Sequence, residues 1–139
     1  MLNDFPNRDA LIELARQIIG AKDTGRPHAD LLAEFEKYST CPDTASLFGA
    51  DYYPEYIVDY AVNWKDYCRK VGRDELLKIV KRILDADGTE AEITLLLVTF
   101  CENCRHSAKS DLIYYPEDYF EGNRDPSAEE IVDKALAGE

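Results

Sequence analysis

The sequence predicts an all-α fold. Apolar residues recur at the three- to four-residue spacing of amphipathic helices through most of the chain. Turn signals are sparse, with 7 glycines and 6 prolines in 139 residues. Thr89 and Ser127 are each followed three residues later by a glutamate, the capping-box pattern that marks a helix start. Together these observations leave little room for strands.

The apolar spacing defines the helices in order. The first repeats Leu11, Ala15 and Ile18 on one face, and the third repeats Ile57, Ala61 and Trp64. The expected helices cover residues 9–21, 29–38, 56–71, 74–84 and 90–104, with a last one from Ser127.

The two halves of the chain repeat each other. Residues 8–21 lie over residues 73–86 at an offset of 65, and Phe35 falls on Phe100 at the same offset. Two further pairs of strings follow in the same order, namely Tyr52-Tyr53-Pro54 with Tyr114-Tyr115-Pro116, and Ile57-Val58-Asp59 with Ile131-Val132-Asp133. A repeat of this size indicates two supersecondary units, which we expect to span residues 1–71 and 72–139. The alternative is two unrelated pairs of amphipathic helices, because helical periodicity alone produces many such alignments.

The chain is strongly acidic, with 28 acidic and 16 basic residues and a net charge of -12. This charge argues against direct binding to nucleic acid or to an anionic membrane. It favours a basic partner that is attracted over a distance by electrostatic steering. The simpler interpretation is that the charge only maintains solubility.

The N-terminus shows no targeting signal. Residues 1–4 lack a basic start, no apolar run follows them, and no segment approaches the roughly 20 apolar residues of a membrane span. We therefore expect a cytoplasmic protein whose cysteines are reduced thiols. They are Cys41, Cys68, Cys101 and Cys104.

Residues 110–116 read Ser-Asp-Leu-Ile-Tyr-Tyr-Pro. Two adjacent tyrosines beside a carboxylate suit a protein-binding anchor, because tyrosine offers a large rigid surface with a polar tip. The string resembles the signature of the immunity proteins that neutralise colicin- and pyocin-type nuclease bacteriocins. Residues 73–138 resemble one complete domain of that family, with two helices, the signature on a short third helix, an acidic loop and a final helix. The resemblance implies two tandem four-helix units, each a distorted antiparallel bundle, with the first half a degenerate copy.

The first half departs from the family pattern at the signature. It keeps Tyr52-Tyr53-Pro54, but Gly49 stands where the aspartate is expected, and the acidic loop is almost absent. The tryptophan that the family carries near its end is missing from the last helix, and Trp64 occupies that position in the first half. The second half is therefore the expected working copy.

The resemblance also implies a function and a set of partner-binding residues. The function is stoichiometric inhibition of the basic nuclease domain of a bacteriocin, without catalysis or cofactor. The residues that select the partner would be Glu90, Ile93, Thr94, Leu97, Val98 and Cys101. The residues that supply affinity would be Ser110, Asp111, Tyr114, Tyr115 and Pro116. The alternative is a tandem helical adaptor that binds other proteins and kept the immunity fold without inhibiting a toxin.

Residues 93–98 are apolar nearly all round the expected helix. Leu96 and Phe100, one turn apart, suit the core of the second unit. The remaining apolar face needs another cover, and two covers fit the pattern: a partner protein, or the first repeat of the chain.

Other site chemistries find little support in the sequence. Cys101 and Cys104 form a single Cys-x-x-Cys pair, whereas a structural zinc site needs four ligands. His106 is expected to lie at a helix end and interact with its carbonyl groups. The carboxylates are scattered and no glycine-rich phosphate loop is present, so we expect no enzyme, no metal and no cofactor.

Overall fold

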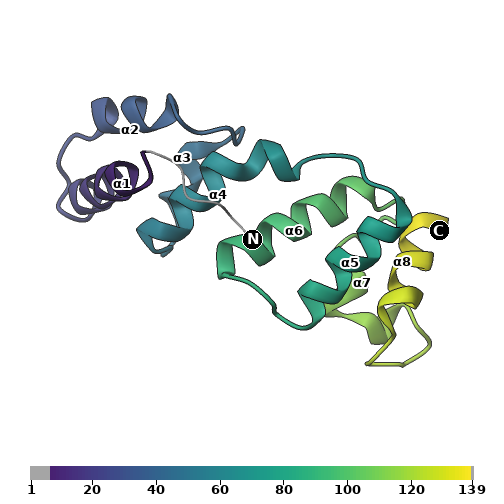
Figure 1. Cartoon of the computed structure of the whole chain (residues 1–139). Helices are drawn as coiled ribbons and strands as arrows, with labels where there is room; N and C mark the ends of the chain where they lie inside the picture. The colour runs from purple at the N-terminus through teal and green to yellow at the C-terminus, as the bar shows by residue number, and fades with distance from the viewer. Residues whose placement is uncertain (1–6, 139) are drawn as a thin grey trace. The chain divides into compact units, whose positions relative to one another are not determined.

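The computed structural model describes residues 7–138, and every regular element in that range is helical (Figure 1). The prediction of an all-α fold is confirmed. The elements are α1 (Arg8–Asp23), α2 (Ala29–Glu36), α3 (Thr44–Leu47), α4 (Pro54–Tyr67), α5 (Arg73–Leu84), α6 (Glu90–Asn103), α7 (Asp111–Tyr114), the 3₁₀ helix η1 (Pro116–Asp118) and α8 (Ala128–Ala137). Within this range no helix is both long enough and apolar enough to cross a bilayer.

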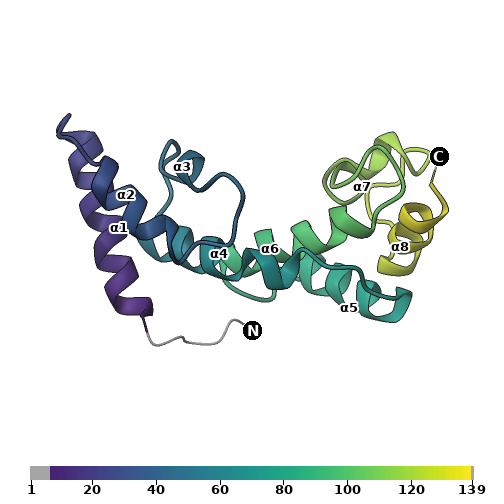
Figure 2. The same ribbon diagram turned by 90° about the horizontal axis from the view of Figure 1, so that it is seen from above.

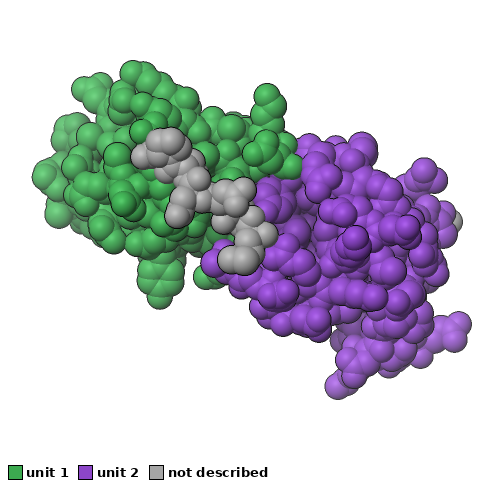
Figure 3. Space-filling view, in the orientation of Figure 1, with its two compact units in different colours: residues 1–66, 90–92 green, residues 67–89, 93–139 purple. Residues whose placement is uncertain are grey.

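The chain divides into two compact units, coloured separately in Figure 3. Unit 1 holds Met1–Asp66 together with Glu90–Glu92, and unit 2 holds Tyr67–Thr89 and Ile93–Glu139. The division falls a few residues ahead of the expected boundary between residues 71 and 72. Each unit has a hydrophobic core of its own.

The core of unit 1 is built from one face of each of its longer helices. Phe35 of α2 is fully buried and meets Phe48 edge to face, with ring centroids 5.3 Å apart. Ile18 of α1 and Ile57 of α4 are also fully buried beside them. Helices α1 and α2 pack against each other, and α3 lies in the connection between α2 and α4 (Figure 2).

The core of unit 2 is formed by residues of α5, α6, α7 and α8. Helices α5 and α8 pack side by side, and α7 packs against α8 (Figures 1 and 2). Phe100 of α6, Leu112 of α7 and Val132 of α8 are fully buried in this core. The predicted capping box at the start of α8 is confirmed, since Ser127 Oγ accepts from the Glu130 amide while the Glu130 carboxylate accepts from the Ser127 amide.

Each unit joins its first helix to its last helix by an equivalent arginine–aspartate pair. Arg8 donates two hydrogen bonds of 2.9 Å to the carboxylate of Asp59. Arg73 donates bonds of 3.1 and 2.8 Å to Asp133 Oδ1. The alignment of the two halves pairs these same residues, so the two units share a specific contact.

The short helices α3 and α7 change one part of the alignment between the halves. At the offset of 65, Leu47 and Phe48 correspond to Leu112 and Ile113, and all four are buried. The string Tyr52-Tyr53-Pro54 then lies beyond α3, and its proline opens the 14-residue helix α4. In the second half, Pro116 opens η1 instead. The two Tyr-Tyr-Pro strings therefore occupy different places, and matching them by sequence alone was wrong.

The two arginine–aspartate pairs differ in burial, and we expect them to differ in energetic weight. Asp59 is buried and accepts both donors of Arg8, so Asp59→Ala should lower the unfolding free energy by about 2 kcal/mol, as loss of a hydrogen bond to a charged group does. Asp133 is exposed, so Asp133→Ala should cost less. Urea unfolding of the two variants measures the difference. Equal losses, or a larger loss for Asp133→Ala, would contradict the comparison.

Candidate protein-binding site

Helix α7 and the residue after it display two tyrosines, because Leu112 and Ile113 anchor the helix in the core. Leu112 and Ile113 are buried in unit 2, while the next two residues, Tyr114 and Tyr115, are 51% and 57% exposed. Amide groups of the single turn bond back to the Ser110 carbonyl, from Ile113 at 2.9 Å and Tyr114 at 3.1 Å. Two large rings thus stand on a short, hydrogen-bonded turn whose position the core determines.

The turn ends at Pro116, which opens η1 and is buried. The proline restricts its own φ angle and those available to Tyr115, which adopts an extended φ of -130°. Pro116 was expected to supply affinity together with four other residues. Because it is buried, its role is to fix the backbone of the turn.

Lys109 joins the end of α6 to this turn. Its ammonium donates to the carbonyl oxygens of Cys104 at 2.7 Å and Cys101 at 3.3 Å, where the negative end of the helix dipole lies. Its backbone has a φ of +53°, in the left-handed region. This capping role was expected of His106, and that expectation was wrong. The His106 ring instead accepts from the Ala108 amide and packs edge to face on Tyr119, with centroids 5.6 Å apart.

Cys101 of α6 lies close enough to Tyr114 of α7 to affect its ionisation. Burial raises the pKa of the Tyr114 hydroxyl, and the neighbouring Cys101 adds to that rise. Burial is also the main cause that raises the pKa of the Cys101 thiol, while a backbone hydrogen bond from Ser110 opposes it. Three of the expected binding residues, Ser110, Tyr114 and Cys101, therefore lie in one place.

The other expected residues of α6 differ in their surroundings. Ile93 and Leu97 are partly buried against the core of unit 2, as is Cys101. Thr94 and Val98 are also only partly exposed. Glu90 is exposed and belongs to unit 1, together with Ala91, which is buried in the core of that unit. The structure thus places Cys101 close to Ser110 and Tyr114, and it does not place Glu90 in unit 2 with the other carried-over residues.

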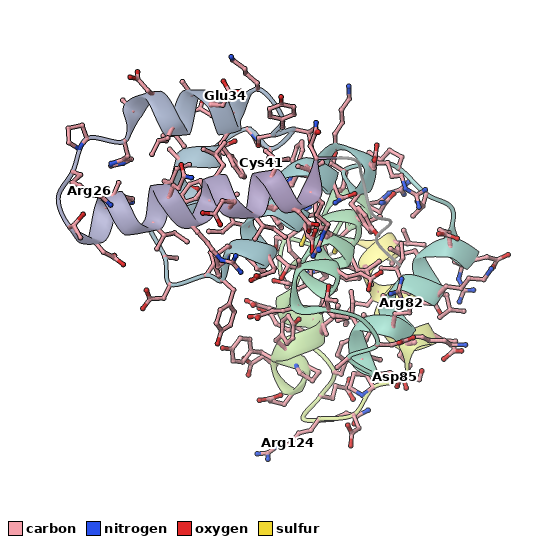
Figure 4. All side chains as sticks on the ribbon, turned by 60° about the vertical axis from the view of Figure 1, so that its left-hand side comes forward. Arg26, Glu34, Cys41, Arg82, Asp85 and Arg124 are labelled. Atoms are coloured by element: carbon pink, nitrogen blue, oxygen red, sulfur yellow. The ribbon has the colours of Figure 1, made fainter. Side chains whose placement is uncertain are left out.

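Acidic groups surround the tyrosine turn. Asp111 is partly exposed at the start of α7, and three exposed carboxylates follow on η1 and the next loop, those of Glu117, Asp118 and Glu121. Glu121 has a φ of +54° and Gly122 a φ of +82°, which turns this loop back on itself. Arg124 extends outward from the same loop (Figure 4). The result is an aromatic patch with a mainly negative border.

Sequence reasoning did not single out Lys109 or Tyr119. Lys109 is exposed in part of its length, but its ammonium serves helix capping. Its capping role could have been predicted from its position, because a lysine just beyond the last apolar turn of a helix is favoured near the helix carbonyl groups.

The four cysteines are free thiols. Cys41 lies in unit 1, after α2 (Figure 4), whereas Cys101 and Cys104 belong to α6 and the residue after it. Among residues 7–138, no three histidine, cysteine or acidic side chains gather as metal ligands would.

Comparison with known families adds to this geometry. Residues 69–137 match the family model described as colicin immunity protein / pyocin immunity protein. Residues 69–137 belong to the colicin/pyocin immunity family. The match contains the whole of the tyrosine turn, the acidic loop and α8, and it confirms the resemblance on which residues 73–138 were assigned. No curated protein and no solved structure matches the chain.

Membership in the colicin/pyocin immunity family assigns this region a role in bacteriocin immunity. The exposed tyrosine turn of unit 2 is the surface on which the immunity role can be tested.

The raised thiol pKa values of Cys101 and Cys104 predict slow alkylation. Burial is the main cause of the rise at both residues, and the thiolate is the form that reacts. A raised pKa leaves a smaller thiolate fraction at every pH below it. Peptide-resolved mass spectrometry with iodoacetamide should show both residues reacting more slowly than N-acetylcysteine amide at pH 8, with the rate rising at higher pH than for that reference. Reaction at the reference rate would contradict the burial that the structure shows.

Proposed function

We propose that this protein protects the cell that makes a nuclease bacteriocin by binding the toxin's basic nuclease domain in a one-to-one inhibitory complex. The observation that carries the proposal is the tyrosine turn, since Tyr114 and Tyr115 are both more than half exposed although the residues directly before them are buried. The family match supports the immunity part of this proposal.

The tyrosine turn suits tight binding because its shape exists before the partner arrives. Leu112 and Ile113 fix the backbone from below, and Pro116 fixes it on the C-terminal side. Binding then orders few degrees of freedom, and ordering costs are a main reason why buried area does not convert into affinity. Tyrosines in such a setting are frequent hot spots of protein interfaces.

The acidic border accounts for the choice of a nuclease as partner. A nuclease domain must hold DNA phosphates on a basic surface, and Asp111, Glu117, Asp118 and Glu121 present carboxylates to such a surface. Once bound, the same carboxylates repel incoming DNA. Inhibition therefore needs no group of the inhibitor to enter the nuclease active site. The partly exposed residues of α6, Ile93, Thr94, Leu97, Val98 and Cys101, would distinguish one nuclease from another.

An immunity gene is expected to lie directly after the gene for its toxin, so a direct test uses the nuclease domain of a bacteriocin encoded there. One equivalent of the purified chain should abolish DNA cleavage, and titration should end at a ratio of one to one. Cleavage that continues at excess protein would refute inhibition of that toxin. Binding without loss of cleavage would indicate that the protein serves as an adaptor.

Tyr115→Ala should weaken nuclease binding by about 2 kcal/mol, roughly thirtyfold in dissociation constant, because it removes a large exposed ring from the centre of the surface. Isothermal titration calorimetry measures the change. Tyr38→Ala is the matched control, because Tyr38 is 42% exposed but belongs to unit 1. Equal effects of the two substitutions would exclude the tyrosine turn as the binding surface.

Neutralising the acidic border should slow association more than it speeds dissociation. The triple variant Glu117→Gln, Asp118→Asn, Glu121→Gln loses charges that steer a basic partner, and surface charges act mainly on the association rate. Stopped-flow measurements should show a roughly tenfold lower rate at low salt, with the difference shrinking as salt screens the charges. The control carries the same charge change in unit 1, as Asp30→Asn, Glu36→Gln, Asp66→Asn. If the control lowers the association rate equally, the effect comes from the net charge of the chain and not from the acidic border.

A further inference from the structure

Unit 1 also displays tyrosines, and the proposed function does not use them. Tyr52 is 39% exposed and Tyr53 72% exposed, in the segment that leads from α3 into α4. Both lie outside the residues that match the immunity family. Tyr53 is more exposed than either tyrosine of the turn in unit 2.

The Tyr52 ring is held in place by a stack of aromatic rings. It lies on Tyr56 with centroids 4.4 Å apart and an angle of 26° between the planes. Tyr56 in turn stacks on Tyr60 at 6.0 Å and 10°. Because Tyr56 is buried, the stack ties an exposed ring to the core of unit 1.

A hollow of about 270 Å³ opens beside Tyr52. It is lined by Ile19, Lys22 and Asp23 of α1 and by Phe48, Gly49, Ala50, Asp51 and Tyr52. The acidic groups of the lining are the carboxylates of Asp23 and Asp51. The cation of the lining, the Lys22 ammonium, donates to the Phe48 carbonyl at 2.7 Å.

Small residues keep the hollow open at the positions where unit 2 has its tyrosines. At the offset of 65, Gly49 corresponds to Tyr114 and Ala50 to Tyr115, while the buried pair before them is apolar in both units. A β-carbon at Gly49 would come within 3.3 Å of the Ser46 carbonyl oxygen, so the backbone there is packed closely. The same turn thus projects in unit 2 and is recessed in unit 1.

We propose that this hollow binds the guanidinium of an arginine on a basic protein partner, which gives the chain a second docking surface separate from the tyrosine turn. The planar cation lies against the Tyr52 ring and pairs with Asp23 and Asp51, a combination that suits arginine better than the compact lysine ammonium. The surrounding charge agrees, because residues 1–66 contain 12 acidic and 6 basic residues, a net charge of -6. Tyr53 supplies further contact area next to the hollow.

The test follows the amide NMR signals of the full chain while N-acetyl-arginine amide is added, with N-acetyl-citrulline amide as a probe of the same shape without charge. The arginine probe should shift the amides of residues 48–52 in a saturable way, in the millimolar range, and the citrulline probe should not. Equal shifts with both probes, shifts spread over acidic residues of both units, or no saturable shift would overturn the proposal. Stronger binding of N-acetyl-lysine amide would overturn the assignment to a guanidinium.

Two variants locate the site. Asp51→Asn preserves side-chain shape and should weaken arginine binding roughly threefold, as should Tyr52→Ala, in line with an exposed cation–π contact. The controls Asp30→Asn and Tyr38→Ala change an exposed aspartate and an exposed tyrosine elsewhere in unit 1 and should leave binding unchanged. Unchanged binding in Asp51→Asn and Tyr52→Ala would refute the hollow as the site. No nuclease takes part in this measurement, so its result is independent of the inhibition assay.

Discussion

The candidate site depends on the burial of two adjacent residues, Leu112 and Ile113, in the core of unit 2. A one-turn helix has too few internal hydrogen bonds to be stable alone. Tertiary packing therefore fixes α7, and it also fixes the direction of the residues that follow. Tyr114 and Tyr115 are exposed because the two residues before them occupy the inward face of the turn.

The capping of α6 contributes to the same constraint. Lys109 uses its charge on the carbonyl groups at the end of α6, and its left-handed backbone turns the chain toward α7. A cation that neutralises a helix end is unavailable as a positive charge on the binding surface. The tyrosine turn thereby keeps an acidic border, which a partner with excess positive charge can approach without opposition.

Much of the fold could be predicted from sequence because helical periodicity is a local property. The capping box at Ser127 could be identified in the same way. The arginine–aspartate pairs were not predicted, because their partners lie more than 50 residues apart in the chain. Matching the two Tyr-Tyr-Pro strings failed because identical letters do not require identical backbone. Pro54 and Pro116 both open a helix, but one opens α4 and the other η1. The role of Lys109 depends on a contact eight residues back along the chain, which no periodic pattern contains.

The two units share particular contacts but present different surfaces. The buried pair at α3 and α7, and the arginine–aspartate pair between first and last helix, are common to both. These contacts determine the position of the turn but not which side chains the turn exposes. Tyrosines at the next two positions give a projecting surface in unit 2, and glycine and alanine give a recessed one in unit 1. A larger side chain at Gly49 would meet the Ser46 carbonyl oxygen, so the recessed surface of unit 1 depends on that glycine. The exposed rings of Tyr114 and Tyr115 can change without disturbing the core of unit 2.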